Sequence, residues 1–251
     1  MTLEQFQRSE MILSSAAMEC MQSMRIIIFG IGGVGSWCAE ALVRSGFYHL
    51  TLVDYDTVCA SNINRQAPAL HSTLGMAKTT ALKQRLLDIN PNAEITEHYE
   101  MFTPENSATF QLHQYDVIVD AIDSVHNKIH LIREACKTDA FFISSMGAAR
   151  KIEASMVAVT SFWNVKNCLF ARRLRKHMRK GEMPQRDFLC VYSMEQTDEG
   201  HELQTVDNAQ KRVNGSLMHI TATFGLHIAG EIIKNTMNTC ATNNNKQTKK
   251  E

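Results

Sequence analysis

The residues with the clearest chemical potential are a glycine-rich turn and a later acidic residue, a combination typical of nucleotide sites. The turn reads Gly30-Ile-Gly-Gly-Val-Gly35, with Gly33 doubling the second glycine. Gly30 and Gly32 let the backbone turn tightly and approach a phosphate without an intervening Cβ, and Gly35 permits close helix packing. Asp54 lies about twenty residues further on, where a carboxylate accepts hydrogen bonds from a ribose. This pattern predicts a nucleotide site, with NAD as the default ligand.

Two cations after Asp54 favour ATP over NAD. Arg65 is a planar, permanently charged donor within Ser61-Asn-Ile-Asn-Arg-Gln66, and Lys78 lies near the start of the next predicted helix. Splitting ATP between its α and β phosphates builds negative charge that a guanidinium and an ammonium stabilise, whereas an NAD site needs neither. We therefore predict Arg65 and Lys78 as catalytic residues and Asn62 as a nucleotide ligand. The alternative is that Asn62 caps a helix and Arg65 points to water.

A carboxylate after another predicted strand is a candidate metal ligand. The sequence there reads Asp120-Ala-Ile-Asp123. In open α/β sheets, residues just past the carboxyl ends of strands line the ligand crevice. Carboxylate oxygens suit Mg²⁺, so Asp123 is predicted as a catalytic residue that binds magnesium and ATP. The alternative is that Asp123 caps the helix predicted over 124–136.

The elements that must position these residues alternate between strand and helix. Apolar runs predict strands over 25–29, 49–53, 93–97, 115–119 and 140–145. Helical periodicity predicts helices over 36–46, 75–90, 124–136 and 215–234. The stretch 151–160 predicts a further strand that leaves the parallel pattern. The predicted fold class is α/β, a Rossmann-like three-layer sheet that is parallel in its first half and gains antiparallel strands in its second.

Composition divides the chain into one domain with two distinct ends. Residues 1–240 are predicted to form a single adenylating domain, in which 1–23 are an N-terminal helical segment. The polar stretch 196–214 predicts a surface loop, and the polar residues 241–251 predict a disordered tail. In the long C-terminal helix, His219, His227 and Glu231 interrupt the apolar run, which argues against an integral membrane span.

Five motifs in this order resemble the adenylate-forming enzymes related to the ubiquitin-activating enzyme, the ThiF/MoeB/HesA family. The motifs are Gly30–Gly35, Asp54-x-Asp56, Ser61-Asn-x-Asn-Arg-Gln66, Gly75-x-x-Lys78 and Asp120-Ala-Ile-Asp123. The resemblance runs from about Glu4 to about Lys234. Within the family, the sequence is most similar to the tRNA-modifying branch. That closer match lies in the stretches 34–46, 89–91, 190–193 and 221–225.

The resemblance implies ATP-dependent dehydration of threonylcarbamoyladenosine in tRNA to its cyclic form. A substrate carboxylate would attack the α-phosphate to give a carboxyl-adenylate, and a nitrogen of the same group would then close the ring. ATP and Mg²⁺ would be the cofactors, together with a monovalent cation, Na⁺ or K⁺. Two alternatives stay open. One is adenylation of the C-terminus of a ubiquitin-like sulfur-carrier protein, which predicts zinc, and the other is a non-catalytic NAD-binding module.

The resemblance also implies partners. The family's N-terminal segment is similar to the residues around Arg8, and there an arginine binds the nucleotide phosphates of the neighbouring subunit, which implies a homodimer. The alternative is that Arg8 is a solvated surface residue. A cysteine desulfurase or a sulfur-acceptor protein is associated with some relatives and is a further candidate partner.

One basic run is a candidate RNA-binding surface in a protein that has no net charge overall. Lys and Arg total 26, as do Asp and Glu, so RNA binding would require a local patch. The predicted phosphate-binding residues are Arg172, Arg173, Arg175, Lys176, Arg179 and Lys180. The alternative is that the run is a solvated helix face.

The cysteines favour a reducing compartment. Seven are scattered through the chain without a C-x-x-C pair, so the structural zinc of the carrier-activating relatives is not expected. The odd count and the lack of a signal peptide predict reduced thiols and a cytoplasmic location. Cys190 lies in an apolar stretch and is predicted to be buried and weakly nucleophilic.

Overall fold

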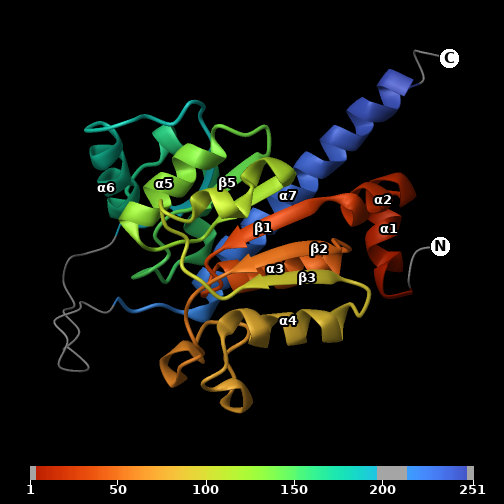
Figure 1. Ribbon diagram of the computed structural model, residues 1–251, viewed down its shortest axis with the longest axis horizontal. Helices are drawn as coiled ribbons and strands as arrows, with labels where there is room; N and C mark the ends of the chain where they lie inside the picture. Colours follow the sequence, from red (N-terminus) through yellow and green to blue (C-terminus); the bar gives the residue numbers. More distant parts are fainter. Residues whose placement is uncertain (1–3, 197–213, 248–251) are drawn as a thin grey trace.

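The computed structural model describes residues 4–196 and 214–247, and a seven-stranded sheet forms the centre of this part of the chain (Figure 1). The strand order is β3-β2-β1-β4-β5-β7-β6. All neighbouring strands are parallel except β6 and β7, which are antiparallel. The predicted fold class is therefore confirmed, including the antiparallel pairing in the second half of the chain.

The strands are short apolar runs buried by helices on both faces. Their bounds are β1 Arg25–Phe29, β2 His49–Val53, β3 Glu94–His98, β4 Val117–Asp120, β5 Phe141–Ser145, β6 Val157–Ser161 and β7 Leu189–Ser193. Side chains alternate across a strand, so Ile26 and Ile28 of β1 join one apolar cluster while Ile27 and Phe29 join the other. This burial on both faces explains why β1 has no polar alternation.

Two helical layers cover the sheet. The helices are α1 Gln7–Leu13, α2 Ser15–Ser23, α3 Gly35–Ser45, α4 Lys78–Ile89, α5 Val125–Ala135, α6 Leu169–Met178 and α7 Met218–Gln247. Apolar side chains of α2, α3, α4 and α7 share one cluster, and those of α5 and α6 share the other. The helices α1 and α2 confirm the predicted N-terminal helical segment, and they lie at the end of the sheet away from the arrowheads (Figure 1).

The C-terminal helix is longer than the sequence predicted. Disorder was expected from residue 241, but α7 continues to Gln247, so that prediction is wrong over 241–247. The stretch contains no proline or glycine, and a helix already anchored against α3 adds one backbone hydrogen bond for each further residue. Residues 248–251, and 197–213 of the predicted surface loop, lie outside the described part. No helix in that part is both long and apolar enough to cross a membrane.

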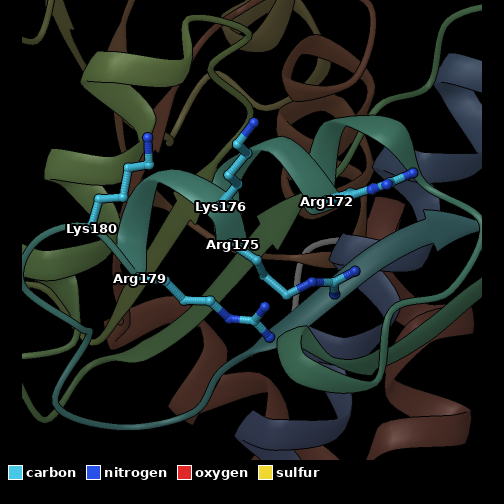
Figure 2. Close-up of a pocket in the computed structure, with 5 residues that line it drawn as sticks. All are labelled: Arg172, Arg175, Lys176, Arg179 and Lys180. Atoms are coloured by element: carbon cyan, nitrogen blue, oxygen red, sulfur yellow. The ribbon is translucent and has the colours of Figure 1, made fainter.

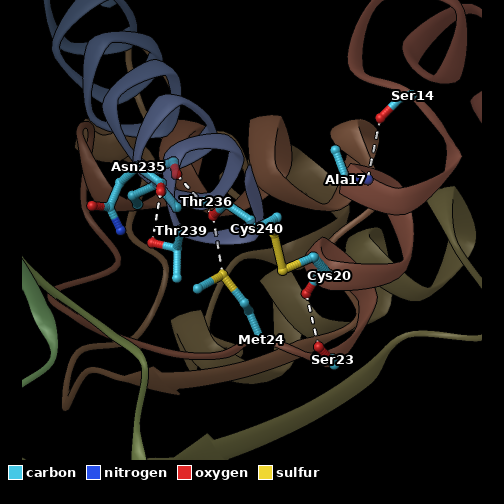
Figure 3. Close-up of a disulfide and its surroundings, with 10 residues drawn as sticks. Ser14, Ala17, Cys20, Ser23, Met24, Asn235, Thr236, Thr239 and Cys240 are labelled. Carbon is cyan, nitrogen blue, oxygen red and sulfur yellow. Dashed lines mark hydrogen bonds between the residues drawn. A yellow bond between two sulfur atoms is a disulfide. The ribbon is translucent and has the colours of Figure 1, made fainter. Parts of the chain in front are cut away.

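A disulfide joins the two ends of the described chain. Cys20 on α2 and Cys240 on α7 have sulfur atoms 2.05 Å apart, although 220 positions separate them in sequence (Figure 3). The prediction of reduced thiols is therefore wrong for this pair. Sequence spacing gave no signal, because only the packing of α2 against α7 brings the cysteines together. Among the described cysteines, the free ones are Cys38, Cys59, Cys136, Cys168 and Cys190.

We expect Cys20→Ser to lower the free energy of unfolding by about 2 to 4 kcal/mol in the absence of reductant, because the bridge restricts the unfolded chain. Urea unfolding with and without dithiothreitol measures this difference. Cys59→Ser, which removes an exposed free thiol, is the matched control and should unfold like the wild type. Equal stability of Cys20→Ser and wild type under oxidising conditions would contradict the stabilising role of the bridge.

Candidate nucleotide-binding and adenylation site

The glycine turn lies between the carboxyl end of β1 and the start of α3, and two of its glycines are required by the protein itself. Gly30 has a φ of +89°, and a Cβ there would lie 2.6 Å from the Ala121 carbonyl oxygen after β4. A Cβ on Gly35 would lie 1.9 Å from the Gly30 carbonyl oxygen. Gly35 therefore closes the turn on itself, whereas the sequence predicted that it packs a helix on a strand.

The other two glycines differ in how much room surrounds them. A Cβ on Gly33 would lie 3.0 Å from the side chain of Thr221, because α7 crosses the turn. A Cβ on Gly32 would approach only the Gln66 Nε2 atom, at 3.9 Å. The position of Gly32 thus leaves space for a ligand at the amino end of α3, where N–H groups and the positive end of the helix dipole attract anions.

Asp54 follows β2, and its carboxylate holds the glycine turn through a hydrogen bond to the backbone. Its Oδ2 accepts a hydrogen bond from the Ile31 N–H at 2.6 Å, and its Oδ1 accepts one from the Asp56 N–H at 2.9 Å. The residue is 8% exposed, and this burial raises the pKa of its carboxyl against the opposing charge of Lys78. In the sequence, Asp54 was assigned to a ribose. Here each of its oxygens also holds the backbone, so it positions the glycine turn.

Lys78 has the anionic partner that its unfavourable place at a helix start required. Its Nζ lies 2.7 Å from Oδ2 of Asp56, and the lysine is 5% exposed. The Asp56 side chain is 47% exposed. The Asp56 carboxylate therefore lies between the buried Lys78 ammonium and the solvent. Since Asp54 also feels the charge of Lys78, the three side chains form one charged cluster.

Arg65 lies in a loop that is braced on both sides. The Trp37 indole of α3 donates to the Arg65 carbonyl oxygen at 2.9 Å, and Asn64 Nδ2 donates to the Ser216 carbonyl oxygen at 2.9 Å. The Arg65 guanidinium uses Nη1 to contact the Ser61 carbonyl oxygen and the Asn64 side chain. These hydrogen bonds leave Nη2 and Nε for an anion, and partial burial lowers the pKa of the guanidinium without removing its charge.

Asn62 has the capping role that the sequence kept as its alternative. Its Oδ1 accepts a hydrogen bond from the Cys59 N–H at 3.1 Å, at the start of a short 3₁₀ turn over Ala60–Asn62. This bond leaves the Nδ2 donor of the same side chain for a ligand. Asn62 therefore shapes the loop of Arg65, and its role as a nucleotide ligand stays a prediction.

Gln66 is a site residue that the sequence reasoning did not select. It is 7% exposed, lies beside Gly32, and its Oε1 accepts no hydrogen bond from any described residue. The next residue ties the same loop to α3, since the Ala67 N–H donates to Ser36 Oγ at 3.2 Å. A buried acceptor without a donor is rare in folded proteins and indicates a missing partner at this position. Its place in the Ser61–Gln66 motif was the available signal.

Asp123 lies just after the carboxyl end of β4, as predicted. It is exposed, and its carboxylate makes no hydrogen bond or ion pair with another described residue. Burial raises the pKa of the Tyr55 hydroxyl, and the charges of Asp56, Asp123 and Asp54 raise it further. The helix cap of α5 is Ser124, so the alternative capping role of Asp123 is not the one observed.

Beneath Asp123 lies a buried ion pair that the sequence analysis missed. Asp120 Oδ2 is 2.8 Å from Lys128 Nζ, and both side chains are 0% exposed. Lys128 also donates to the Ile122 carbonyl oxygen at 3.0 Å, while Asp120 Oδ1 accepts from the Ile122 N–H at 3.1 Å. The pair thus fixes the backbone that carries Asp123. Burial raises the pKa of Asp120 although Lys128 opposes the shift.

Cys190 lies near this pair and is fully buried, which confirms its predicted burial. Burial raises the pKa of its thiol, so the reactive thiolate is disfavoured. Among the described residues, no group of three or more His, Cys, Asp or Glu side chains lies close enough to bind a metal ion. The expected lack of zinc stays a prediction.

Two predicted groups do not join this site within one chain. Arg8 is exposed on α1, which packs with α2 near the C-terminal end of α3, opposite the glycine turn. The basic residues of α6 lie on the far half of the sheet, beyond β5 (Figure 1). The site that the fold does assemble therefore contains the glycine turn, the Asp54–Asp56–Lys78 cluster, the Arg65 loop and Asp123.

Comparison with known proteins gives a consistent result. The chain is similar to the tRNA threonylcarbamoyladenosine dehydratase of Bacillus subtilis, with 38% identity over 178 residues, 71% of this chain and 70% of the relative. It is 30% identical to the Escherichia coli dehydratase over 251 residues, 93% of this chain and 94% of the relative. A crystal structure of the E. coli enzyme in complex with ATP gives a TM-score of 0.86 at 30% identity, covering 95% and 96% of the two chains.

A family model matches residues 6–250, nearly the entire sequence. The matched region contains the glycine turn, the loop of Arg65 and the strand that precedes Asp123, so the family similarity and the site geometry refer to the same residues. This chain belongs to the ThiF family.

Proposed function

We propose that this protein catalyses ATP-dependent dehydration of N6-threonylcarbamoyladenosine in tRNA, giving the cyclic form through a carboxyl-adenylate. The main support is the combination of an anion-binding glycine turn with two cations and a free carboxylate at one edge of the sheet. Similarity to dehydratases over more than nine-tenths of the E. coli relative supports this substrate over a sulfur-carrier protein.

The proposed binding mode uses the features left unsatisfied in the structure. The space at Gly32 and the amino end of α3 receive the phosphates, and Arg65 provides Nη2 and Nε. The lone Oε1 of Gln66 accepts a hydrogen bond from a hydroxyl or amino group of the adenosine. The solvated carboxylate of Asp56 shields Lys78 until the triphosphate competes for its ammonium.

In the proposed reaction, an oxygen of the substrate carboxylate bonds to the α-phosphorus while the bond to pyrophosphate breaks. Arg65 and Lys78 stabilise the negative charge that develops on the leaving oxygens. A nitrogen of the same threonylcarbamoyl group then attacks the activated carbonyl carbon, and AMP leaves with the former carboxylate oxygen. The net change in the nucleoside is loss of one water, and no enzyme thioester is needed, which agrees with the buried thiol of Cys190.

Magnesium is part of this proposal, and Asp123 would bind it. Mg²⁺ prefers one or two carboxylates together with substrate phosphates, and the exposed, unpaired carboxylate of Asp123 fits that preference. When bound, Mg²⁺ would neutralise phosphate charge. A monovalent cation, Na⁺ or K⁺, is proposed from the family resemblance alone. Asp54 remains the backbone anchor and is not needed as a metal ligand.

Mass spectrometry of tRNA nucleosides tests the reaction. Incubation of threonylcarbamoylated tRNA with protein, Mg²⁺ and ATP should lower the mass of the modified adenosine by one water, and omission of ATP should abolish the change. An unchanged nucleoside would overturn the proposal. Pyrophosphate exchange only after addition of a ubiquitin-like protein would favour carrier activation, and NAD binding without ATP turnover would favour a non-catalytic module.

We further propose that the active unit is a homodimer in which Arg8 binds the phosphates of the partner subunit. Arg8 is exposed at the edge of the sheet opposite its own site, and Met11 and Ile12 on the same helix are 83% and 81% exposed. Exposed apolar side chains of this size are typical of surfaces that another protein covers.

Mixing of inactive variants tests this arrangement. Arg8→Ala and Arg65→Ala should each be inactive alone, whereas unfolding and refolding an equal mixture should restore about a quarter of wild-type activity, because half the dimers would contain one complete site. Light scattering measures the dimer. Absence of any recovery in a mixture that forms dimers would contradict a role for Arg8 across the interface.

We propose a cytoplasmic location, which a tRNA substrate would support. Thiol pools there keep most disulfides reduced, so alkylation of Cys20 and Cys240 in freshly lysed cells would reveal which state the bridge occupies. A cysteine desulfurase or a sulfur-acceptor protein is a further proposed partner, supported by the family resemblance, and affinity purification from its own cells tests it.

A further inference from the structure

The helix α6 presents cations on its outer side and is anchored by its inner side. Ala171, Leu174 and Met178 are buried, at the spacing of one helix face. The basic run lies on the other side, with Arg172, Arg173, Arg175 and Lys176 on the helix and Arg179 and Lys180 just after its end, and only Arg175 of the six is partly covered. Because the apolar face is used inside the protein, Leu169 at the start of α6 is the only large apolar side chain of this described helix that is exposed, unlike the broad apolar face of an interfacial membrane helix.

The cations of α6 lack acidic partners and border two hollows. Among the described residues, none of the six forms an ion pair. One hollow of about 400 Å³ is lined by Arg172, Arg175, Lys176, Arg179 and Lys180, and Figure 2 shows Arg175 and Arg179 extending to one side of the helix and Lys176 and Lys180 to the other. A second hollow of about 370 Å³ shares Arg172 and Arg175 and adds Lys166, Asn167 and Gln196. Unpaired cations around two hollows that share lining residues favour a polyanion.

Arg175 connects the two hollows and is held in place. Its Nη1 donates to the Phe162 carbonyl oxygen at 2.9 Å, and its guanidinium lies 5.7 Å from the centre of the Phe162 ring. This single anchored nitrogen leaves the other donors of the fork for a ligand. A cation fixed in this way loses little side-chain entropy when it binds a phosphate.

The second hollow reaches the edge of the sheet that contains the nucleotide site. Asn167 Nδ2 donates to the Met194 carbonyl oxygen, just past the carboxyl end of β7, which runs parallel to β5. Phe170 of α6 lies between Gly147 after β5 and Lys128, whose Nζ is 5.7 Å from its ring. Three strand spacings, about 14 Å, separate β1 from β7 along this edge.

We propose that the outer face of α6 binds the phosphate backbone of tRNA and guides the modified nucleotide past Asn167 and Gln196 to the edge of the sheet. This inference rests on the proposed dehydration of tRNA. Phosphates along one RNA strand match a row of long basic side chains, and their contacts would fix the register of the RNA without reading bases. The amide side chains at the inner end supply the donors and acceptors that a splayed nucleotide requires.

Salt-dependent binding of fluorescent tRNA tests this surface. The double variant Lys176→Ala/Lys180→Ala should bind roughly tenfold more weakly than wild type, and the slope of log K against log salt should fall by about 2 between about 50 and 200 mM salt. The control Lys83→Ala/Lys234→Ala removes the same charge from lysines of α4 and α7 that pair with Glu97 and Glu231. It should retain wild-type affinity and slope, and all proteins should bind ATP alone equally.

The outcomes separate the surface from the reaction. If wild type dehydrates tRNA but the α6 variant binds RNA like the control, the proposed surface is wrong and the reaction stands. If the α6 variant loses RNA binding while wild type leaves the nucleoside unchanged, the surface stands and the reaction is wrong. Binding to vesicles of phosphatidylcholine and phosphatidylglycerol in preference to tRNA, lost in the α6 variant, would overturn RNA as the partner.

Discussion

Arg65→Ala is expected to lower kcat/KM for ATP-dependent dehydration on the order of 10³-fold, the effect of removing an arginine that stabilises charge in phosphoryl-type transfer. The guanidinium is held by the Ser61 carbonyl oxygen and the Asn64 side chain, so its remaining donors point from a fixed position. Its loss removes interactions that strengthen as pyrophosphate departs. ATP–pyrophosphate exchange and formation of the cyclic nucleoside measure the effect.

The matched control is Arg44→Ala on α3. Arg44 pairs with Glu40, and its side chain is 57% exposed, so its removal should change turnover little. Circular dichroism and thermal unfolding should show that Arg65→Ala retains the fold, because the loop is also braced by Trp37 and Asn64. Wild-type turnover in Arg65→Ala would exclude the proposed role of this guanidinium.

Lys78→Ala should abolish adenylation in the same assay. The variant leaves Asp56 without its ammonium partner, but the Asp56 side chain is 47% exposed and water can replace that contact. The fold should therefore survive while the second cation of the site is lost. If both Lys78→Ala and Arg65→Ala lose ATP–pyrophosphate exchange but unfold at the wild-type temperature, the loss of activity comes from the lost charge. A lower unfolding temperature for Lys78→Ala would instead show that the variant has lost structure.

Lys128→Met is expected to lower the free energy of unfolding at neutral pH by about 3 to 5 kcal/mol. The substitution keeps the length of the apolar stem but leaves the Asp120 carboxylate charged, buried and without its cation. Ser144 Oγ, at 2.7 Å, and the Ile122 N–H would still donate to Asp120, but neither neutralises it. Urea unfolding of wild type and variant measures the loss.

The pH dependence of that loss follows from Asp120. Burial raises the pKa of this carboxyl in the folded state, and without Lys128 the shift should grow. A folded pKa above the unfolded one favours folding when the group is protonated, and that contribution disappears as the pH rises through the folded pKa. The deficit of Lys128→Met relative to wild type should therefore shrink as the pH is lowered.

Two controls make the result specific to the buried pair. Lys137→Met removes a lysine from the turn that follows α5, where it forms a partly exposed pair with Glu134, and should cost less than about 1 kcal/mol. The double variant Lys128→Met/Asp120→Asn removes both charges and should recover part of the lost stability. Additive losses in the double variant would show that the two side chains act independently.

Much of the fold and the outline of the site were predictable from sequence because both depend on short-range patterns. The apolar run at 25–29 and the glycines that follow define a strand, a turn and a helix within one unit. Glycine is needed at Gly30 because of its positive φ, a local property of the turn. The Ser61–Gln66 motif likewise pointed to this loop as part of the candidate site before its contacts were known.

The pairing of charges and thiols was decided only by tertiary structure. Asp54 and Asp56 are nearly adjacent, yet one holds the glycine turn and the other pairs with Lys78. Lys128 is neutralised by a carboxylate on a neighbouring strand end, and Cys20 is joined to Cys240 across nearly the full chain. Such partners are set by which elements pack together, since the free energy of a charge or thiol contact depends on distance in space and on burial, neither of which follows from sequence spacing.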